Sequence, residues 1–210
     1  MQILIATGNK HKLSELSRLL PAAFSSGEKI EYLGLADFAI TLPEETGSTF
    51  AENARLKAVH AAKQSGLPAL SDDTGLLVDY LHGAPGVHTA RYAGETCDAA
   101  ANNQKLLRAL EGVPFEKRTA RFKTVACLAW PDGNMQLFEG ICEGHIAENY
   151  HGTNGFGYDP IFVVDELGKC FAELTADEKN AVSHRGRAFG KVRTFLTTFH
   201  NLRLNIPKMV

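Results

Sequence analysis

Residues 3–20 read ILIATGNKHKLSELSRLL, and this stretch determines the class of fold that we predict. The short apolar run at residues 3–6 stops at Thr7-Gly8-Asn9, which is typical of a buried strand that ends in a turn. Leucines then recur at helical spacing until Pro21 ends the segment. A strand, a polar loop and a helix in this order predict an open α/β sheet, in which ligands bind at the carboxyl ends of strands.

Signals for helices and strands continue along the rest of the chain. Capping boxes at Thr49–Glu52 and Thr175–Glu178 predict the starts of two helices, and the first of these ends at Gly66. Periodicity and turn signals predict a further helix over about 98–110, a hairpin of strands 121–130 and 135–146, and short strands at 68–70 and 161–164. Ser183 is expected to cap a last helix, whose apolar face comprises Ala188, Val192, Phe195, Leu196, Phe199 and Leu202. With no repeat and no linker, we predict one α/β domain over residues 1–210 with a mixed sheet.

Composition and charge exclude several classes of protein. The chain has 210 residues, of which 44% are hydrophobic, and a formal net charge of −2. Because it lacks a strong basic excess, a nucleic-acid polymer is not an expected partner. The cysteines never form a CxxC pair and the histidines form neither HxH nor HExxH, which argues against zinc. A secretion signal and a long apolar run are both missing, so we expect a cytoplasmic protein that does not contact a membrane.

The loop at residues 7–12 has the composition of a phosphate-binding loop. Gly8 permits close approach of the backbone, the helix that follows offers free N–H groups at its start, and Lys12 adds a positive charge. The loop does not match the Walker A motif GxxxxGK[ST]. On local grounds, an ordinary strand-to-helix turn with exposed lysines fits it equally well.

Two pairs of adjacent acids are candidates for metal binding and for the activation of water. We expect Asp72-Asp73 to lie at the end of a strand, where neighbouring side chains point to opposite sides and only one faces a given site. Two carboxylates beside Thr74 and a glycine suit Mg²⁺ coordination. Glu44-Glu45 precedes the helix that begins after Thr49. An acidic surface turn and a favourable charge near a helix start are the alternative interpretations of the two pairs.

Two segments in the second half of the chain could bind a base. In residues 156–160, an aromatic face can stack on a base and Asp159 can accept hydrogen bonds from ring N–H groups. At the start of the last helix, Arg185 could donate to a keto oxygen, and the charge of His184 near pH 7 depends on its surroundings. A core aromatic pair with a pre-proline aspartate in a turn explains the first segment at least as well.

Taken together and in order, these motifs resemble the inosine triphosphate pyrophosphatase (ITPase) family. The resemblance covers about residues 3–197. The motifs that carry it are Thr7-Gly8-Asn9-x-x-Lys12, Glu44-Glu45-Thr46-Gly47, Glu52-Asn53-Ala54 with Lys57, Asp72-Asp73-Thr74-Gly75, Gly83-Ala84-Pro85-Gly86, Ala90-Arg91-Tyr92, Gly155-Phe156-Gly157-Tyr158-Asp159-Pro160 and Ser183-His184-Arg185-Gly186. Chance agreement of so many motifs in the same order is negligible.

The resemblance implies a fold, an activity and a set of partners. The implied fold is a two-lobed α/β unit with a long mixed sheet flanked by helices and an active-site cleft between the lobes, usually in a homodimer. The implied activity is Mg²⁺-dependent hydrolysis of deaminated purine nucleoside triphosphates (ITP, dITP and XTP) to the monophosphate and pyrophosphate, which cleanses the nucleotide pool. The implied partners are the nucleotide and a second copy of the chain, with neither a nucleic-acid polymer nor a membrane.

The resemblance also implies a role for each matched residue. Glu45 and Asp73 would bind Mg²⁺, and Asp73 would be the catalytic base, with Asp72 beside it. The substrate-binding residues would be Thr7, Gly8, Asn9, Lys10, His11, Lys12, Lys57, Thr74, Phe156, Gly157, Tyr158, Asp159, Lys179, His184 and Arg185. Residues 7–12 and Lys57 would bind the triphosphate, and the residues from 156 onward would form the base pocket. Thr74 stands where the family uses Ser or Thr, which keeps the hydroxyl group.

Selectivity for the base follows from hydrogen bonding. Hypoxanthine and xanthine present a 6-keto acceptor to a donor such as Arg185, whereas adenine would leave that donor unpaired at a cost of about 1–3 kcal/mol. The exclusion of guanine, the ranking of ITP, dITP and XTP, and the number of Mg²⁺ ions do not follow from the sequence. Three alternatives stay open: a catalytically silent nucleotide sensor, a Maf-like pyrophosphatase, and a phosphatase that releases single phosphates. The motifs at 156–159 and 183–185 argue against the second.

Overall fold

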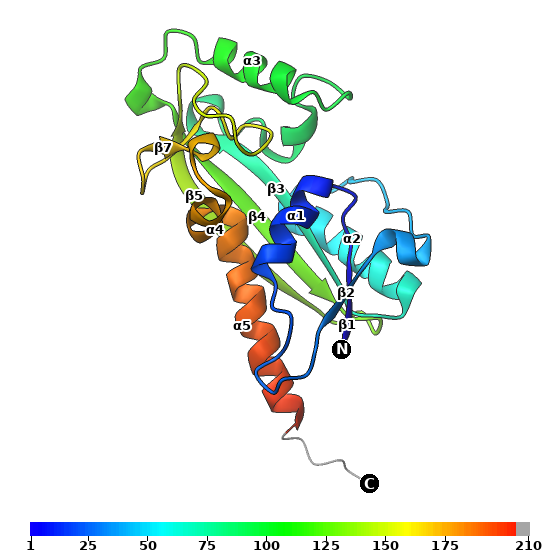
Figure 1. Cartoon of the computed structure of the whole chain (residues 1–210). Coiled ribbons are helices and arrows are strands. Elements are labelled where there is room, and N and C mark those ends of the chain that lie inside the picture. The colour runs from blue at the N-terminus through cyan, green and yellow to red at the C-terminus, as the bar shows by residue number, and fades with distance from the viewer. Residues whose placement is uncertain (205–210) are drawn as a thin grey trace. The chain divides into compact units, whose positions relative to one another are not determined.

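The structure is a computed structural model that describes the backbone of residues 1–204 and the side chains of residues 1–198. Within residues 1–204, strands and helices alternate up to the fourth strand, and three further strands and then two helices follow (Figure 1). In chain order they are β1 (Gln2–Ile5), α1 (Lys10–Leu19), β2 (Glu31–Gly34), α2 (Phe50–Ser65), β3 (Ala69–Val78), α3 (Ala99–Ala109), β4 (Thr119–Ala129), β5 (Met135–Ile146), β6 (Phe162–Val164), β7 (Lys169–Cys170), α4 (Ala176–Val182) and α5 (His184–Leu204). No helix in the described part of the chain is both long enough and apolar enough to cross a membrane.

The strands form one mixed sheet in the order β2-β1-β3-β4-β5-β6-β7. Strand β1 pairs in parallel with both β2 and β3, whereas β6 pairs antiparallel with both β5 and β7. Strands β4 and β5 are joined by a tight turn, in which the Trp130 N–H donates to the Asn134 carbonyl at 2.9 Å. The predicted α/β class and the predicted mixed sheet are therefore confirmed.

The chain divides into two compact units. The first unit contains residues 1–73, 125–138 and the segment from Ala188 onward, and the second contains residues 74–124 and 139–187. Each unit has its own cluster of buried apolar side chains.

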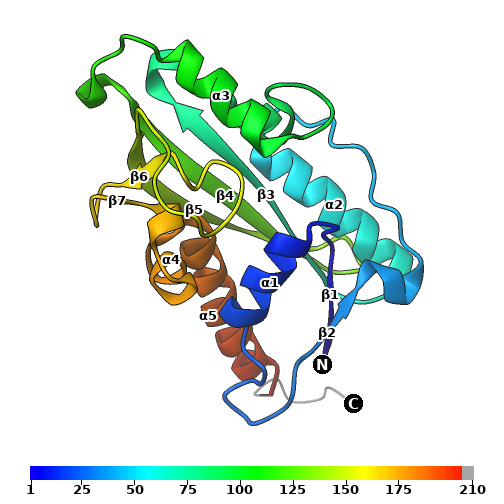
Figure 2. The same cartoon turned by 45° about the horizontal axis from the view of Figure 1, so that its top comes forward.

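The core of the first unit lies between the sheet and the helices α1 and α5. Ile3 and Ile5 of β1 belong to this core, together with Leu16 of α1 and Phe189 of α5. Leu4 lies between the two isoleucines and so points to the opposite face, where α2 covers the sheet (Figure 2). Of the apolar face predicted for the last helix, Ala188, Val192 and Leu196 are buried, Phe195 is half-buried, and Phe199 and Leu202 lie outside the described side chains.

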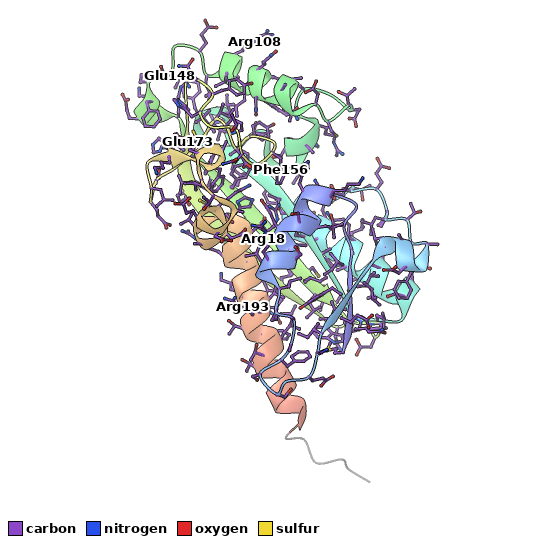
Figure 3. All side chains as sticks on the ribbon, in the orientation of Figure 1. Arg18, Arg108, Glu148, Phe156, Glu173 and Arg193 are labelled. Carbon is purple, nitrogen blue, oxygen red and sulfur yellow. The ribbon has the colours of Figure 1, made fainter. Side chains whose placement is uncertain are left out.

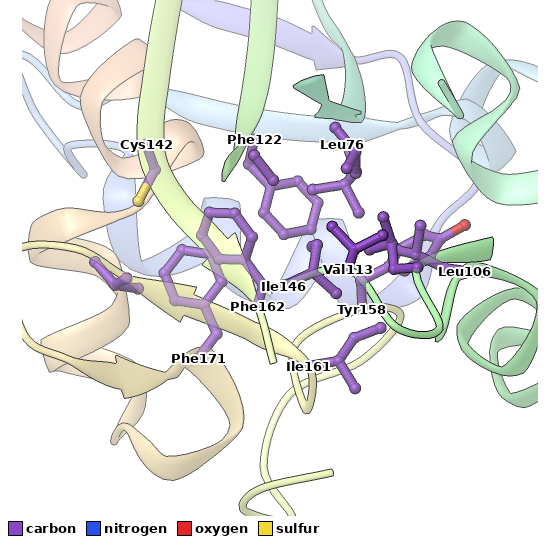
Figure 4. Close-up of a cluster of buried hydrophobic side chains, with 14 of the residues drawn as sticks. Leu76, Leu106, Val113, Phe122, Cys142, Ile146, Tyr158, Ile161, Phe162 and Phe171 are labelled. Carbon is purple, nitrogen blue, oxygen red and sulfur yellow. The ribbon is translucent and has the colours of Figure 1, made fainter. Parts of the chain in front are cut away.

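The core of the second unit combines aliphatic side chains with the rings of Phe122, Tyr158, Phe162 and Phe171 (Figure 4). The ring of Phe122 meets that of Phe162 edge-on at a centroid distance of 4.7 Å, and Phe162 lies 5.1 Å from Phe171. Offset and edge-on pairs of this kind add about 0.5–1.5 kcal/mol beyond the burial of their area. Leu106 of α3 and Leu110, the residue that caps its end, complete the core from the helical side.

Local sequence signals set the helix ends as predicted. Thr49 Oγ1 accepts from the Glu52 N–H at 3.1 Å, and the Glu52 carboxylate accepts from the Thr49 N–H at 3.1 Å. Gly66 then ends α2 in a left-handed conformation with φ 70°. At the start of α5, the Gly186 N–H donates to Ser183 Oγ at 3.0 Å, which confirms Ser183 as a cap.

The prediction that a strand ends before Asp72-Asp73 is wrong. Strand β3 continues through both acids to Val78, so they lie inside the strand. Lys12 and Lys57 lie beside the two acids, which offsets the cost of burying carboxylates within the strand. The neighbouring β1 does end here, since its last residue Ile5 pairs with Leu70. The two acids therefore lie just beyond the carboxyl end of β1.

Candidate active site

The loop between β1 and α1 is capped by its own side chains. Asn9 Oδ1 accepts from the N–H groups of His11 and Lys12, at 2.9 and 3.2 Å. Thr7 Oγ1 in turn accepts from the Asn9 N–H at 3.2 Å. The expectation of free N–H groups at this helix start is therefore wrong for residues 11 and 12, because asparagine is a strong N-cap that binds them. Gly8 to His11 are exposed.

Lys12 binds the first of the two strand acids. Its Nζ lies 2.9 Å from Asp72 Oδ2, and the Asp72 side chain is fully buried. Leu70 precedes Asp72 by two residues and belongs to the core beneath α1 and α5, so both point to that face of the sheet. Asp72 thus fixes the first turn of α1 to β3.

Lys57 binds the second strand acid from the other face. Its Nζ lies 2.5 Å from Glu45 Oε1, 2.8 Å from the Asp72 carbonyl oxygen and 3.8 Å from Asp73 Oδ1. Burial alone would lower the pKa of Lys57, but the negative charges of Asp73, Asp72 and Glu45 outweigh this effect and raise it. Adjacent acids therefore point to opposite faces, as predicted, and each meets a lysine.

Asp73 is a largely buried carboxylate with several charged neighbours. Burial raises its pKa, and the negative charge of Glu45 acts in the same direction. The positive charges of Lys57 and Lys12 and a hydrogen bond from Asn53 oppose this rise without cancelling it. Asn53 Nδ2 donates to Asp73 Oδ2 at 3.1 Å. The Asp73 carboxyl group therefore binds its proton more tightly than an aspartate in water does.

The two acids beside Lys57, which are Glu45 and Asp73, fit a magnesium ion. No group of three or more His, Cys, Asp or Glu side chains that could hold a metal occurs in the described part of the chain. Glu45 and Asp73 nevertheless bring two carboxylates to the same ammonium group of Lys57. Mg²⁺ is characteristically bound by one or two carboxylates together with substrate phosphates and water, rather than by a complete protein cage. The donor set is therefore adequate for Mg²⁺ in the presence of a phosphate ligand.

The segment at residues 155–159 forms a compact turn around a buried ion pair in the second unit. Asp159 Oδ2 lies 2.7 Å from Lys179 Nζ and accepts from the Phe156 N–H at 2.8 Å. The Lys179 ammonium also lies 4.8 Å from the centroid of the Phe156 ring. Gly155 has φ 77°, and a Cβ there would meet Asp159 Oδ2 at 2.0 Å. Phe156 is labelled in Figure 3.

Tyr158 occupies a different environment from Phe156. It is buried among the apolar side chains of the second core, and its hydroxyl group donates to the Thr89 carbonyl oxygen at 2.9 Å. Burial raises the pKa of this hydroxyl. Its ring therefore packs in the core, which is the alternative to base stacking that the sequence left open for residues 156–160. Phe156 is the less buried of the two.

Arg185 and His184 meet two strands of the second unit at the start of α5. Arg185 Nη2 donates to Thr74 Oγ1 at 3.2 Å, although 111 residues separate the two along the chain. The Thr74 hydroxyl lies 2.5 Å from that of Thr124 in β4. His184 stacks on Phe122 with a centroid distance of 4.6 Å and an angle of 12° between the rings. Both side chains from α5 are almost completely buried.

The predicted residues thus fall into two clusters, one in each unit. The first-unit cluster comprises Lys12, Glu45, Lys57, Asp72 and Asp73, and the second-unit cluster comprises Thr74, Phe156, Asp159, Lys179, His184 and Arg185. Lys10 and His11 lie on the exposed first turn of α1. In the first-unit cluster, Lys12 lies beside Asp72, and Lys57 lies beside Glu45 and Asp73.

Sequence reasoning assigned no role to three buried polar residues that contact these clusters. Asn53 contacts Asp73, Thr124 contacts Thr74, and Asn103 Nδ2 donates to the Gly157 carbonyl oxygen at 3.0 Å. Asn53 could have been found, because it lies four residues before Lys57 on the same buried face of α2. Thr124 and Asn103 carry no comparable local signal.

A surface pocket in the second unit lies apart from the predicted site residues. Its volume is about 610 Å³, and it is lined by Leu107, Arg108, Glu111, Gly112, Val113, Pro114, Arg118, Glu148 and Asn149. Arg108 and Glu148 are labelled in Figure 3. The buried Arg118 donates to the carbonyl oxygens of Val113, Ala147 and Leu110. These bonds tie the end of α3 to nearby loops, so the role of Arg118 is structural.

Relatives of known sequence and structure resemble this chain over nearly its whole length. The model of the Ham1 family matches residues 3–195. A dITP/XTP pyrophosphatase of Elusimicrobium minutum is 57% identical over 193 residues, which make up 91% of this chain and 98% of that protein. A dITP/XTP pyrophosphatase of Desulforamulus reducens is 47% identical over 201 residues, which make up 95% and 98% of the two chains.

Solved structures show the same fold. A HAM1 protein from Coxiella burnetii has a TM-score of 0.85 and 44% identity, covering 94% of this chain and 99% of that chain. A nucleoside-triphosphatase / dITP/XTP pyrophosphatase from Mycobacterium abscessus has a TM-score of 0.74 and 43% identity, covering 91% and 98%. These matches confirm the resemblance that the motifs indicated. The chain belongs to the Ham1 family.

Proposed function

We propose that this protein hydrolyses deaminated purine nucleoside triphosphates (dITP, ITP and XTP) to the nucleoside monophosphate and pyrophosphate. The relatives named dITP/XTP pyrophosphatase support the substrate class, since they match this chain over almost its full length. The observation that carries the chemistry is that the carboxylates of Glu45 and Asp73 both lie beside the ammonium group of Lys57. Carboxylates and a lysine in this arrangement can bind a metal-complexed triphosphate.

Positive charge must be gathered where the triphosphate binds, because the chain as a whole carries −2. Lys12 and Lys57 would contact the phosphate oxygens, and each is held in place by a strand acid until the substrate arrives. The loop at residues 7–12 would add its backbone and the Thr7 and Asn9 side chains. A phosphate that took the place of Asn9 Oδ1 would receive the N–H groups of His11 and Lys12.

Glu45 and Asp73 are the residues that would hold Mg²⁺. The ion, when bound, supplies a Lewis acid that neutralises charge on the phosphates. Asp73 would orient a water molecule toward the α-phosphorus and take up its proton. A bond forms between the water oxygen and the α-phosphorus, and the bond from that phosphorus to the bridging oxygen breaks, so that pyrophosphate leaves with the electron pair.

The second-unit cluster would recognise the base. Phe156 offers a ring for stacking, and Asp159 and the adjacent Lys179 of α4 offer an acceptor and a donor beside it. Arg185 would donate to the 6-keto oxygen that hypoxanthine and xanthine share. Gly157, Tyr158 and His184 would shape this pocket, Tyr158 through its core packing and His184 through its stack on Phe122.

A substrate panel tests the proposed function. The protein is assayed with Mg²⁺ and each of dITP, ITP, XTP, dATP, ATP and GTP, and both pyrophosphate and orthophosphate are measured. We expect pyrophosphate from the three deaminated nucleotides and little turnover of the others. Orthophosphate as the product, or ATP turnover at the dITP rate, would contradict the proposal.

Asp73→Asn separates an enzyme from a nucleotide sensor. We expect this variant to bind dITP but to lose at least about 100-fold in kcat, the range typical for the loss of a general base. Asp79→Asn is the matched control, because Asp79 is a surface carboxylate that pairs with Arg121, and it should keep the wild-type rate. A wild-type protein that bound dITP without hydrolysing it would favour the sensor.

Two further features of the family belong to the same proposal. The protein would act as a homodimer, which light scattering at several concentrations can test. The cytoplasm, where the nucleoside triphosphates are used, is the compartment that the activity requires. Fractionation followed by an activity assay would check it.

A further inference from the structure

Asn53 has a buried amide that contacts one of the two carboxylates assigned to the metal and the loop that follows the other. It lies in the first turns of α2, and only 2% of the residue is exposed. Its amide group makes one hydrogen bond to the loop that follows Glu45 and another to Asp73 in β3. The side chain therefore connects a loop, a helix and a strand that all carry proposed active-site residues.

The orientation of this amide is determined by its neighbours. The Gly47 N–H can only donate, so the atom that faces it at 2.7 Å is the carbonyl oxygen Oδ1. The amino group Nδ2 then faces Asp73 Oδ2 at 3.1 Å and donates to it. Aspartate in place of Asn53 could keep the first bond, but it would place a second carboxylate against Asp73.

The loop packs tightly against Asn53. A Cβ atom at Gly47 would lie 2.6 Å from Asn53 Oδ1 and 2.7 Å from Glu52 Cβ. At these distances the neighbouring atoms would have to move. The neighbouring Ser48 N–H donates to the Glu52 carboxylate at 2.8 Å. Two consecutive helix residues thus hold the loop directly after Glu45, and glycine at position 47 permits the close approach.

The link through Asn53 is independent of Lys57. Lys57 also joins Glu45 to Asp73, but its ammonium group lies on a flexible stem and has three rotatable donors. A triphosphate that draws Lys57 toward its own oxygens weakens that connection. The amide of Asn53 is buried and directional, so its two hydrogen bonds persist while Lys57 changes partners.

We propose that Asn53 is a positioning residue that holds the Glu45 loop and Asp73 at a fixed separation during the reaction. This inference rests on the proposed function, since it takes Glu45 and Asp73 as the residues that bind Mg²⁺. Residues that orient metal ligands typically contribute about 10- to 100-fold to metal affinity or activity.

The test compares Asn53→Leu and Asn53→Asp with a matched control. Leucine has a similar branched shape but cannot form hydrogen bonds, and aspartate keeps only the acceptor for Gly47. Asn102→Leu is the control, because Asn102 is equally buried in the second unit and its amide binds the Ala93 N–H and the Ala90 carbonyl oxygen at 2.6 and 2.8 Å. The Asn102 variant loses two buried hydrogen bonds of the same kind, with no carboxylate involved.

Three readouts separate positioning from simple loss of stability. Hydrogen exchange of the Gly47 amide, followed by NMR, reports the loop directly. Titration with Mn²⁺ in the absence of nucleotide reports the carboxylates without any turnover. Steady-state kinetics with dITP separate kcat from KM. All are measured at a temperature at which each variant is folded by circular dichroism.

For Asn53→Leu, we expect a deprotected Gly47 amide, weaker Mn²⁺ binding, and a kcat lower by about 10- to 100-fold with KM changed much less. Asn53→Asp should keep the Gly47 amide protected and still lose kcat, because its new carboxylate repels Asp73. Asn102→Leu should lower the melting temperature but leave all three readouts unchanged.

Wild-type kcat and Mn²⁺ affinity in Asn53→Leu would overturn the inference while leaving the proposed function intact. An equal loss of kcat in Asn102→Leu would also overturn it, since general destabilisation would then explain the effect. A wild-type protein without activity on dITP would instead contradict the proposed function, whatever the variants do.

Discussion

Lys12 Nζ lies 2.9 Å from Asp72 Oδ2, and this ion pair joins the first turn of α1 to the interior of β3. The carboxylate is fully buried, whereas the lysine keeps part of its side chain in solvent. A buried charge that loses its partner is costly, so the pair links the stability of the first unit to its proposed phosphate site.

Replacement of Lys12 by Met should therefore destabilise the protein and also weaken substrate binding. We expect a loss of about 3 kcal/mol in the free energy of unfolding, the range for breaking a buried ion pair from one side. KM for dITP should rise because a phosphate contact is lost. Urea denaturation and steady-state kinetics measure the two effects.

The double variant Lys12→Met/Asp72→Asn is the control for this prediction. It removes both charges, so most of the stability should return while KM stays high. If the double variant were as unstable as the single one, the ion pair would not be the cause.

Thr124→Val should impair selectivity for the base. Thr74 Oγ1 accepts a hydrogen bond from Arg185 and lies 2.5 Å from the hydroxyl of the fully buried Thr124, so it can donate its own O–H in a hydrogen bond to Thr124. Valine has the same shape but no acceptor, so the hydrogen bond that orients the Thr74 hydroxyl is lost. We expect Arg185 to lose its orientation and the ratio of kcat/KM for dITP over dATP to fall by about 10-fold or more.

Thr124→Ser keeps the hydroxyl and should retain the wild-type ratio. Equal ratios in the valine and serine variants would show that the hydroxyl of Thr124 has no part in selectivity.

Acid should remove the contribution of the α4 capping box to stability. The pKa of Glu178 is lowered from its ordinary value of 4.5, chiefly by the hydrogen bond from the Thr175 N–H and also by that from the Thr175 hydroxyl. A group whose pKa is lower in the folded state stabilises the protein above its unfolded pKa, and this stabilisation is lost as the pH falls through the folded pKa. Glu178→Gln should therefore melt below the wild type at pH 7.

The difference in melting temperature between Glu178→Gln and the wild type should shrink as the pH falls below 4.5. Thermal melts at pH 7, 5 and 3.5 measure it. A difference that stayed constant over this range would mean that the carboxylate charge does not contribute.

Gly144→Ala should destabilise the second unit. A Cβ at this position of β5 would lie 2.2 Å from the Val163 carbonyl oxygen and 2.6 Å from the ring of Phe162. The backbone oxygen cannot move without breaking the pairing of Gly144 with Val164. We expect a loss of at least about 2 kcal/mol in the free energy of unfolding, as for other overpacked interior sites.

Gly190→Ala provides the contrast within α5. A Cβ there meets no atom within 4 Å, so the variant should gain about 0.5–1 kcal/mol from its better helix propensity. Chemical denaturation of both variants checks the pair, and a stabilised Gly144→Ala would contradict the packing described for β5 and β6.

Local signals predicted most of the elements, because their causes lie within a few residues. Thr49 and Glu52 cap α2 through hydrogen bonds across three positions, and Gly66 ends the helix because it adopts a positive φ easily. Local chemistry made Lys12, Glu45 and Asp73 candidates for a phosphate and metal site, but their specific roles, and any role for Lys57, came from the resemblance of motifs.

Other features were not predictable from local sequence, because they depend on partners far along the chain. Asp72 and Asp73 resemble the end of a strand until Lys12 and Lys57 are placed beside them. Asn9 resembles part of an open phosphate loop, yet its side chain caps α1.

The sequence by itself determined the order of helices and strands, the family and the residues that could carry chemistry, because capping, periodicity and motif order are encoded in neighbouring positions. Only the tertiary structure decided that Asp72 faces Lys12, that Asp73 faces Lys57 and Asn53, and that Arg185 reaches Thr74. The physical reason is that a buried charge or amide is stable only when a partner of matching charge or hydrogen-bonding group lies beside it, and folding alone brings such distant partners together.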